Sequence, residues 1–258
     1  MMFIEEPVSA RTSAPAASST PRPGSVSVVI PTLNEERNIA WVLERLPDLA
    51  TEVILVDGRS TDRTVDIARE LRPDIKVVLE STPGKGAALR AGFAAASGDY
   101  IVMLDADGSM DPGEIERFVD AMRRGCEFVK GSRFAPGGGT SDISTIRRLG
   151  NGALRIAVNK LYRTHFSDLC YGYIGFHRDK LDVLRLRSTG FEIETEMTVR
   201  AVTTSLRIGE VASFEFERQH GESNLNAWRD GRRALRTLVR ERIMLPKTTL
   251  AGRTADHR

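Results

Sequence analysis

Short apolar runs alternate with amphipathic stretches along the first half of this chain, and that alternation limits the fold more than any other feature. The candidate strands are residues 26–30, 52–56, 76–79, 100–104 and 128–131. Between them, apolar residues recur every three or four positions, as on a helix with one buried face. Short strands alternating with such helices are typical of a mostly parallel sheet flanked by helices. The sequence therefore predicts an α/β fold.

Turn-forming and capping residues predict where these elements begin and end. Pro31 is expected to end the first strand. Ser60 or Thr61 is expected to cap the helix that follows the second strand. Asp111 and Pro112 resemble a helix start, with proline at the first helical position.

The second half of the chain has a different texture. A glycine-rich loop at 137–139 precedes a basic helix that begins near Ile146. Strands are expected at 173–176 and 211–216, with a helix at 191–203 between them. A last helix, at 227–244, combines an apolar face with six arginines: Arg229, Arg232, Arg233, Arg236, Arg240 and Arg242.

Composition places the chain among soluble globular proteins. Its 258 residues suffice for one large domain or two small ones. Its formal net charge of +2 is too small for the strongly basic surface of a nucleic-acid-binding protein, so no nucleic-acid partner is expected. Cys126 and Cys170 have no metal-type spacing and are expected to be reduced core residues of a cytosolic protein. No apolar run reaches 18 residues and no secretory signal is evident, so a cytoplasmic location is expected. Residues 1–25 are expected to be a disordered leader.

Polar segments follow three of the candidate strands, at 31–35, 57–60 and 105–109. In parallel α/β sheets, ligands bind beyond the carboxyl ends of the strands. Asp105 and Asp107 are spaced so that both carboxylates can reach one small volume, where a cation is expected between them. Oxygen ligands of this kind suit Mg²⁺ or Mn²⁺. The alternative is an ordinary turn at the end of a strand.

Six motifs occur in order along the chain: Val-Val-Ile-Pro-Thr-Leu-Asn-Glu (28–35), Val-Asp-Gly-Arg-Ser-Thr-Asp (56–62), Gly-Lys-Gly (84–86), Asp-Ala-Asp (105–107), Gly-Ser-Arg-Phe (131–134) and His-Gly-Glu-Ser-Asn-Leu (220–225). Together they make the chain similar to family 2 glycosyltransferases with the GT-A (Rossmann-like) fold, especially the dolichyl-phosphate mannose synthase group and its bacterial relatives. The resemblance implies metal-dependent, inverting transfer of a hexose from a UDP- or GDP-linked sugar, with polyprenyl phosphate as the expected acceptor.

The resemblance also implies roles on the donor side. The residues implied for the nucleotide are Pro31, Thr32, Asn34, Glu35, Asp57, Lys85, Asp105 and Ala106. Asp105 and Asp107 would hold Mg²⁺ or Mn²⁺ on the donor diphosphate, with Ser109 nearby. Asp57 would contact the base, or alternatively cap a helix. Lys85 would contact phosphate, or alternatively lie exposed at a turn.

On the acceptor side, Arg133 and Arg147 match positions associated with an acceptor phosphate, and Asn151 belongs with them. The alternative for Arg133 is an ion pair with a neighbouring acid. Arg218 matches a position near the donor phosphates, and His220 is a further candidate catalytic residue. Four residues depart from the common family pattern: Ser109 replaces an amide, Asn151 a hydroxyl residue, Asn224 a lysine and His220 a tyrosine.

The acceptor decides whether a protein base is needed. A lipid phosphate is largely a dianion at neutral pH and needs none, whereas a hydroxyl acceptor needs one. The candidates are Asp168, Glu194, Glu196 and His220, although Glu196 alternatively pairs with Arg200. A sugar nucleotidyltransferase stays open as another class, but it would carry a glycine-rich basic loop after the first strand, and residues 31–35 are acidic without glycine. A nucleotide-sugar-binding module without catalysis also stays open.

The resemblance suggests a division of the chain. Residues 26–223 are expected to form the glycosyltransferase domain, with a nucleotide-binding half at 26–134 and a C-terminal acceptor half at 135–223. Residues 224–258 are expected to be a basic amphipathic helix and tail. That helix either presents a solvated face or makes peripheral contact with anionic lipid at the inner face of a membrane.

Overall fold

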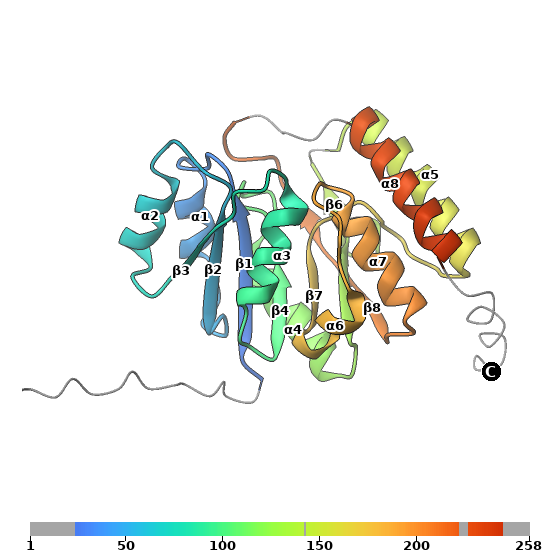
Figure 1. Ribbon diagram of the computed structural model, residues 1–258, viewed down its shortest axis with the longest axis horizontal. Helices are drawn as coiled ribbons and strands as arrows, with labels where there is room; N and C mark the ends of the chain where they lie inside the picture. Colours follow the sequence, from blue (N-terminus) through green and yellow to red (C-terminus); the bar gives the residue numbers. More distant parts are fainter. Residues whose placement is uncertain (1–23, 142, 222–226, 245–258) are drawn as a thin grey trace, which may run out of the picture.

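Continuous apolar runs give the central strands two buried faces, and these strands form one sheet at the centre of the molecule (Figure 1). The computed structural model describes residues 24–141, 143–221 and 227–244. Within them, a seven-stranded sheet has the order β3-β2-β1-β4-β7-β5-β8. The strands are β1 (Val26–Thr32), β2 (Glu52–Asp57), β3 (Lys76–Leu79), β4 (Tyr100–Met103), β5 (Phe128–Ser132), β7 (Ile174–His177) and β8 (Ile208–Ala212). Only β7 runs antiparallel to its neighbours, so the predicted mostly parallel sheet is confirmed.

Helices cover both faces of the sheet. They are α1 (Ile39–Glu44), α2 (Thr64–Leu71), α3 (Lys85–Ala95), α4 (Ile115–Arg123), α5 (Thr145–Tyr162), α6 (Leu181–Leu184), α7 (Ile193–Thr203) and α8 (Ala227–Met244), with short 3₁₀ turns η1 (Pro112–Glu114) and η2 (Arg178–Lys180). Val28 and Ile30 pack with α1, α2 and α4 in one hydrophobic cluster. Val29, between them, packs with α3, α6 and α7 in a second cluster on the opposite face.

A third hydrophobic cluster joins α5, α7 and α8 beside the sheet. Leu238 of α8 is fully buried in it with Tyr162 of α5, whose hydroxyl donates to the Leu238 carbonyl at 3.2 Å. Arg200 of α7 pairs with Glu241 of α8 at 3.0 Å. The basic final helix is therefore packed on the α/β body, and one of its faces is left exposed. No helix among the described residues is long and apolar enough to cross a membrane.

Two predicted boundaries at the carboxyl edge of the sheet are wrong. Pro31 lies inside β1. Its nitrogen, which carries no hydrogen, points toward β4, and β4 pairs with β1 only as far as Val29. The proline therefore removes no hydrogen bond between the two strands. The helix after β2 begins at Thr64, not beside Ser60 or Thr61, because Asp62 accepts the backbone N–H of Thr64 at 3.0 Å. The predicted helix start at Asp111 and Pro112 is confirmed, since the Asp111 carboxylate accepts the Gly113 N–H at 2.9 Å.

The predicted strand at 211–216 is two strands. Ser213 donates its N–H to the Ser132 carbonyl at 2.9 Å, and beyond it the chain leaves the main sheet. The continuation, β9 (Phe214–Glu215), pairs with β6 (Gly139–Thr140) in a separate two-stranded sheet. This change of sheet places Glu215 next to the carboxyl edge, because Met110 forms a bridge with it.

The packing of α3 against the sheet predicts opposite outcomes for two glycines. A Cβ at buried Gly92 would overlap Val29 and Val56 in β1 and β2, whereas a Cβ at Gly150 in α5 meets nothing within 4 Å. Gly92→Ala should lower the free energy of unfolding by about 1–3 kcal/mol through overpacking. Gly150→Ala should raise it by up to about 1 kcal/mol, since alanine favours helix. Urea unfolding followed by circular dichroism measures both, and a stabilised Gly92→Ala would contradict this packing.

Candidate active site

A cavity of about 770 Å³ opens at the carboxyl edge of the sheet. It collects the ends of β1 and β4, the starts of α3 and α7, and parts of the loops at 170–172 and 218–221. Ten of the residues predicted for the site line it: Pro31, Thr32, Glu35, Lys85, Asp105, Ala106, Asp107, Ser109, Arg147 and Arg218. Five do not: Asn34, Asp57, Arg133, Asn151 and His220. The donor-side prediction and the cavity therefore coincide better than the acceptor-side prediction does.

Asp105 lies in the loop directly after β4, ion-paired to Lys85 from the start of α3. The Lys85 Nζ is 2.6 Å from Asp105 Oδ1 and 2.7 Å from Glu194 Oε1 on α7. Burial raises the pKa of Asp105 to about 6; Lys85 opposes the rise, and Asp107 and Glu194 add to it. Burial alone would lower the pKa of Lys85, but its two carboxylate partners raise it above its ordinary value. Lys85 is therefore a firmly charged, largely buried ammonium, not an exposed lysine at a turn.

Glycines on both sides of Lys85 explain how the lysine reaches the cavity. Gly84 has φ +117°, and a Cβ there would collide with the Thr189 carbonyl oxygen. A Cβ at Gly86 would lie 2.6 Å from the Ser188 carbonyl oxygen. The close approach is fixed by a hydrogen bond of 3.1 Å from the Ala87 N–H to the Thr189 carbonyl. The Gly-Lys-Gly motif thus docks the start of α3 against the segment that leads into α7.

Asp107 forms the second ion pair of the cavity. The Arg218 Nη2 is 3.0 Å from Asp107 Oδ2, and its Nη1 is 3.0 Å from Glu35 Oε1. Ser109 donates both its backbone N–H, at 3.0 Å, and its hydroxyl, at 2.7 Å, to Asp107 Oδ1. Backbone contact between Gln219 and Asp107 holds the 218–220 loop over this turn. Asp105 and Asp107 are therefore each matched by one basic side chain from a distant part of the chain.

The donor set at this edge fits a hard divalent cation shared with a diphosphate. Two carboxylates and the Ser109 hydroxyl supply oxygen atoms, the ligand type that Mg²⁺ and Mn²⁺ prefer. The described residues contain no cluster of three or more acidic, histidine or cysteine side chains able to hold a metal ion by themselves. Mg²⁺ is commonly held by one or two carboxylates with substrate phosphates and water completing its shell, and this set matches that pattern.

Asn34 and Asp57 shape the loops beside the cavity. Asn34 has φ +57°, and its side-chain oxygen accepts the Thr61 N–H at 2.8 Å. Buried Asp57 accepts the N–H groups of Arg59 and Ser60, each at 3.1 Å. Asp57 thus holds the turn after β2, and the wall of the cavity at that turn is formed by Gly58 and Arg59.

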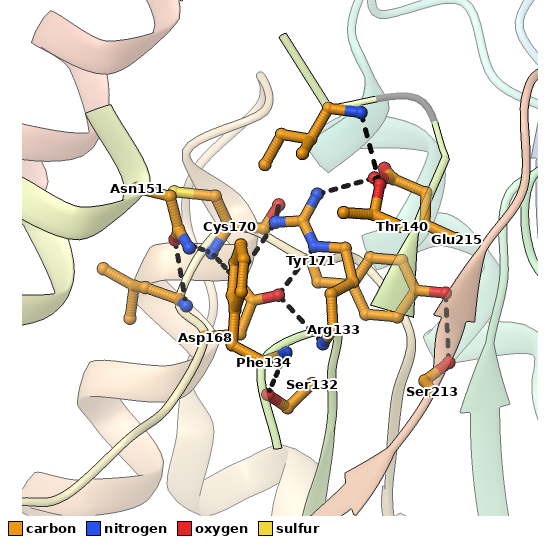
Figure 2. A network of polar contacts seen from close by, with 12 residues as sticks. Ser132, Arg133, Phe134, Thr140, Asn151, Asp168, Cys170, Tyr171, Ser213 and Glu215 are labelled. Carbon is orange, nitrogen blue, oxygen red and sulfur yellow. Dashed lines mark hydrogen bonds and ion pairs between the residues drawn. The ribbon is translucent and has the colours of Figure 1, made fainter. Parts of the chain in front are cut away.

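Arg133 is the centre of a buried network (Figure 2). Its Nε and Nη2 donate to the two oxygens of Asp168 at 2.7 and 3.0 Å, and its Nη1 donates to Glu215 Oε2 at 3.0 Å. Only 2% of the Arg133 side chain is exposed, and Asp168 is fully buried. This geometry matches the ion-pair alternative for Arg133 and not a direct contact with an acceptor phosphate. Asn151 is also structural here, since its Oδ1 accepts the N–H groups of Leu169 and Cys170.

Of the two arginines predicted for the acceptor phosphate, Arg147 is the one that lines the cavity. Its Nη2 lies 3.4 Å from Glu215 Oε1, so Glu215 links Arg147 to buried Arg133. Glu215 and this link were not predicted, because β9 could not be separated from the longer strand expected at 211–216. The hydrogen-bond pattern of Glu215, with Thr140 donating at 2.7 Å, ties β9 to β6 as well.

The four candidate general bases lie in different surroundings, and one of them lines the cavity. Glu194 lines the cavity and is paired with Lys85. Glu196 is fully buried and pairs with Arg200 at 2.8 Å, as the alternative prediction holds. Asp168 is committed to Arg133. His220 is exposed and outside the cavity lining, and its carbonyl accepts a hydrogen bond from Asn38 at 3.0 Å.

Comparison with known proteins gives consistent matches. The family model described as Glycosyl transferase family 2 matches residues 27–185. Glycosyltransferase AglJ of Haloferax volcanii is 33% identical over 217 residues, covering 82% of this chain and 70% of that protein. The dolichol-phosphate mannosyltransferase of Pyrococcus furiosus is 32% identical, covering 78% of this chain and 59% of that protein. The undecaprenyl-phosphate mannosyltransferase of Micrococcus luteus is also 32% identical, covering 78% of this chain and 87% of that protein.

A solved structure matches the same fold. Glucosyl-3-phosphoglycerate synthase from Mycobacterium tuberculosis, in complex with Mn²⁺, UDP and glucosyl-3-phosphoglycerate, superposes with a TM-score of 0.68. The match covers 86% of this chain and 81% of that one at 24% sequence identity. At this identity the likeness shows a shared fold.

The Arg133 network predicts a large stability effect at a position outside the cavity. Arg133→Met should lower the free energy of unfolding by about 3–5 kcal/mol, because Asp168 would stay buried without its cation. Arg123→Met is the matched control, since Arg123 is half-exposed and lies 3.8 Å from exposed Asp120. The control should change stability by less than about 0.5 kcal/mol. Equal effects in denaturant unfolding would show that the network adds nothing specific.

Proposed function

We propose a donor and an acceptor for this chain, which belongs to glycosyl transferase family 2 and is therefore an enzyme that transfers sugars. The donor is a hexose linked to UDP or GDP, and the acceptor is polyprenyl phosphate. The observation that carries the proposal is the cavity at the carboxyl edge of the sheet, where Asp105 and Asp107 face Lys85 and Arg218. The named ligands of the solved relative, UDP and Mn²⁺, support the donor half.

Mg²⁺ or Mn²⁺ fits Asp105, Asp107 and Ser109, and when bound it would supply a Lewis acid for the negative charge that develops on the leaving diphosphate. Lys85 and Arg218 add two fixed positive charges in the same partly buried space, where they act more strongly than in water. Thr32 and Glu35 form the wall at the end of β1, where the nucleotide is proposed to lie. Asp57 holds the neighbouring turn after β2 by accepting the N–H groups of Arg59 and Ser60.

The acceptor phosphate is proposed to bind at Arg147. This arginine lies on the first turn of α5 and lines the same cavity as Asp105. A phosphate dianion attacks without a protein base, which agrees with the commitment of Asp168 and Glu196 to ion pairs. The names of the mannosyltransferases from P. furiosus and M. luteus support a polyprenyl phosphate acceptor. A single displacement at the anomeric carbon would invert its configuration.

A hydroxyl acceptor on a saccharide or small molecule is the second candidate. Glu194 favours it, because Glu194 lines the cavity and is the one carboxylate among the four candidate bases found there. Its pairing with Lys85 at 2.7 Å argues against it, since the ammonium already occupies the carboxylate oxygen Oε1. A nucleotidyltransferase, or binding without catalysis, finds no comparable support in the site.

Peripheral membrane contact through α8 belongs to the same proposal. Leu235, Val239 and Ile243 are 51%, 49% and 77% exposed and recur every fourth residue on one face. Arg236 and Arg240 lie beside them. Apolar side chains flanked by arginines suit the surface of an anionic bilayer, at the cytoplasmic face of which a polyprenyl phosphate would be presented.

The donor proposal predicts metal-dependent stabilisation by a nucleotide sugar. Among UDP- and GDP-sugars screened with Mn²⁺ or Mg²⁺, at least one should raise the melting temperature by several degrees through ligand linkage. Asp105→Asn should abolish the metal-dependent part of the shift, whereas Asp120→Asn, on the exposed face of α4, should keep it. Thermal denaturation measures the shifts, and no response to any nucleotide sugar would reject the proposed donor class.

The acceptor proposal predicts a selective loss at Arg147. With undecaprenyl phosphate in vesicles, Arg147→Gln should lower kcat/KM for the acceptor by about tenfold to a hundredfold, the value of a charge-assisted hydrogen bond. Its donor affinity should not change, and Arg155→Gln, two turns along α5, should behave as the wild type. Transfer of a radiolabelled sugar measures kcat/KM for both variants. The contact of α8 with lipid predicts in addition that transfer is faster with anionic vesicles than with neutral ones. Transfer to soluble hydroxyl acceptors alone would favour the second candidate.

A further inference from the structure

Two basic side chains each bridge one aspartate of the Asp105–Asp107 pair to a glutamate on another element. Lys85 Nζ lies 2.6 Å from Asp105 and 2.7 Å from Glu194. Arg218 lies 3.0 Å from Asp107 and 3.0 Å from Glu35. All six side chains are at least partly buried, with exposed fractions between 10% and 28%. The two bridges have the same composition: one aspartate from the loop after β4, one cation and one glutamate.

A carboxylate held by a cation is a weaker metal ligand, because the metal must compete with the existing ion pair. A buried cation that loses its only partner is strongly disfavoured. Here each cation has a second carboxylate, so Lys85 can stay on Glu194, and Arg218 on Glu35, when the aspartates take other partners. Exchange at the aspartates therefore leaves no buried charge unpaired.

The formal charges agree with such an exchange. Within the two bridges, four carboxylates and two basic groups leave an excess of two negative charges. One divalent cation balances that excess, and a diphosphate donor then meets Lys85 and Arg218 as well as the metal. A donor dianion without the metal would meet a net negative site.

We propose that Lys85 and Arg218 are exchangeable counter-ions of Asp105 and Asp107, retained on Glu194 and Glu35 when a divalent cation binds the aspartates. In the ligand-free enzyme they weaken binding of the free cation, and in the complex they face the donor diphosphate. The proposal rests on the proposed function, which places the cation at these two aspartates.

The test is a double-mutant cycle on Mn²⁺ binding with no nucleotide present. Electron paramagnetic resonance of free Mn²⁺ gives the Kd directly, at one fixed pH. Lys85→Gln should bind Mn²⁺ about tenfold more tightly than the wild type, because Asp105 has no competing cation. Glu194→Gln should bind it about tenfold more weakly, because Lys85 then has only Asp105. In the double variant the effect of Glu194→Gln should vanish, so its Kd should match that of Lys85→Gln.

Two simpler accounts give different results. If Lys85 merely holds Asp105 in place, Lys85→Gln binds Mn²⁺ more weakly or equally, which overturns the proposal. If only the net charge of the cavity matters, the two effects add and the double variant returns to the wild-type Kd, which also overturns it. Lys76→Gln is the matched control for loss of one lysine charge. Lys76 contacts the Ala95 carbonyl at the far end of α3, about 15 Å from Lys85, and its replacement should leave the Kd unchanged.

Variants of the second bridge give an independent test in case the Lys85 variants do not fold. Arg218→Gln and Glu35→Gln should repeat the pattern, tighter and weaker respectively, and melting temperatures without ligand show which variants are folded. Failure of both bridges to show opposite signs rejects the exchange. Because the test uses Mn²⁺ without a donor, its result is independent of the nucleotide-sugar screen, which tests the proposed function separately. No detectable Mn²⁺ binding by any variant, Lys85→Gln included, also rejects the exchange.

Discussion

Pairing of buried charge is the constraint on which the site depends. The carboxyl edge of the sheet gathers acidic side chains from α7 and from the loops after β1 and β4 into a partly buried cavity, where unpaired carboxylates would be strongly disfavoured. Lys85 and Arg218 meet that requirement from positions 133 residues apart in the chain. Buried charge is paired in the same way outside the cavity lining, where Arg133 is held between Asp168 and Glu215. The cavity wall and its support are thus both built from matched ions.

The fold was largely predictable because its signals are local. Apolar runs that are buried on both faces mark parallel strands, and polar residues directly after them mark the ligand-binding edge. This reasoning placed Asp105, Asp107 and Glu35 at the cavity, where the structure has them. It failed at Pro31 because the end of a strand depends on where its neighbour stops pairing, which no local pattern reports.

The acceptor side was less predictable because its residues act through partners distant in sequence. Arg133 and Arg147 are both arginines that follow a strand or open a helix, yet one is buried in a network and the other lines the cavity. The difference is set by Asp168 and by Glu215, whose strand leaves the main sheet at Ser213. A sequence shows both acids, but not that Asp168 pairs with Arg133 while Glu215 contacts both arginines. The same holds for Glu194 and Glu196, two residues apart on α7, one facing the cavity and the other α8.

The close approach at Gly84 has a consequence for how this sequence can vary. The atom that a side chain at position 84 would strike is the main-chain oxygen of Thr189, which every amino acid carries. No substitution at position 189 can therefore accommodate a side chain at position 84, so a change at one position cannot compensate for a change at the other. Gly84 should tolerate change only if the backbone of the segment before α7 moves, and with it Glu194. The backbone of a segment a hundred residues further along the chain thus restricts variation at position 84, whatever side chains that segment carries.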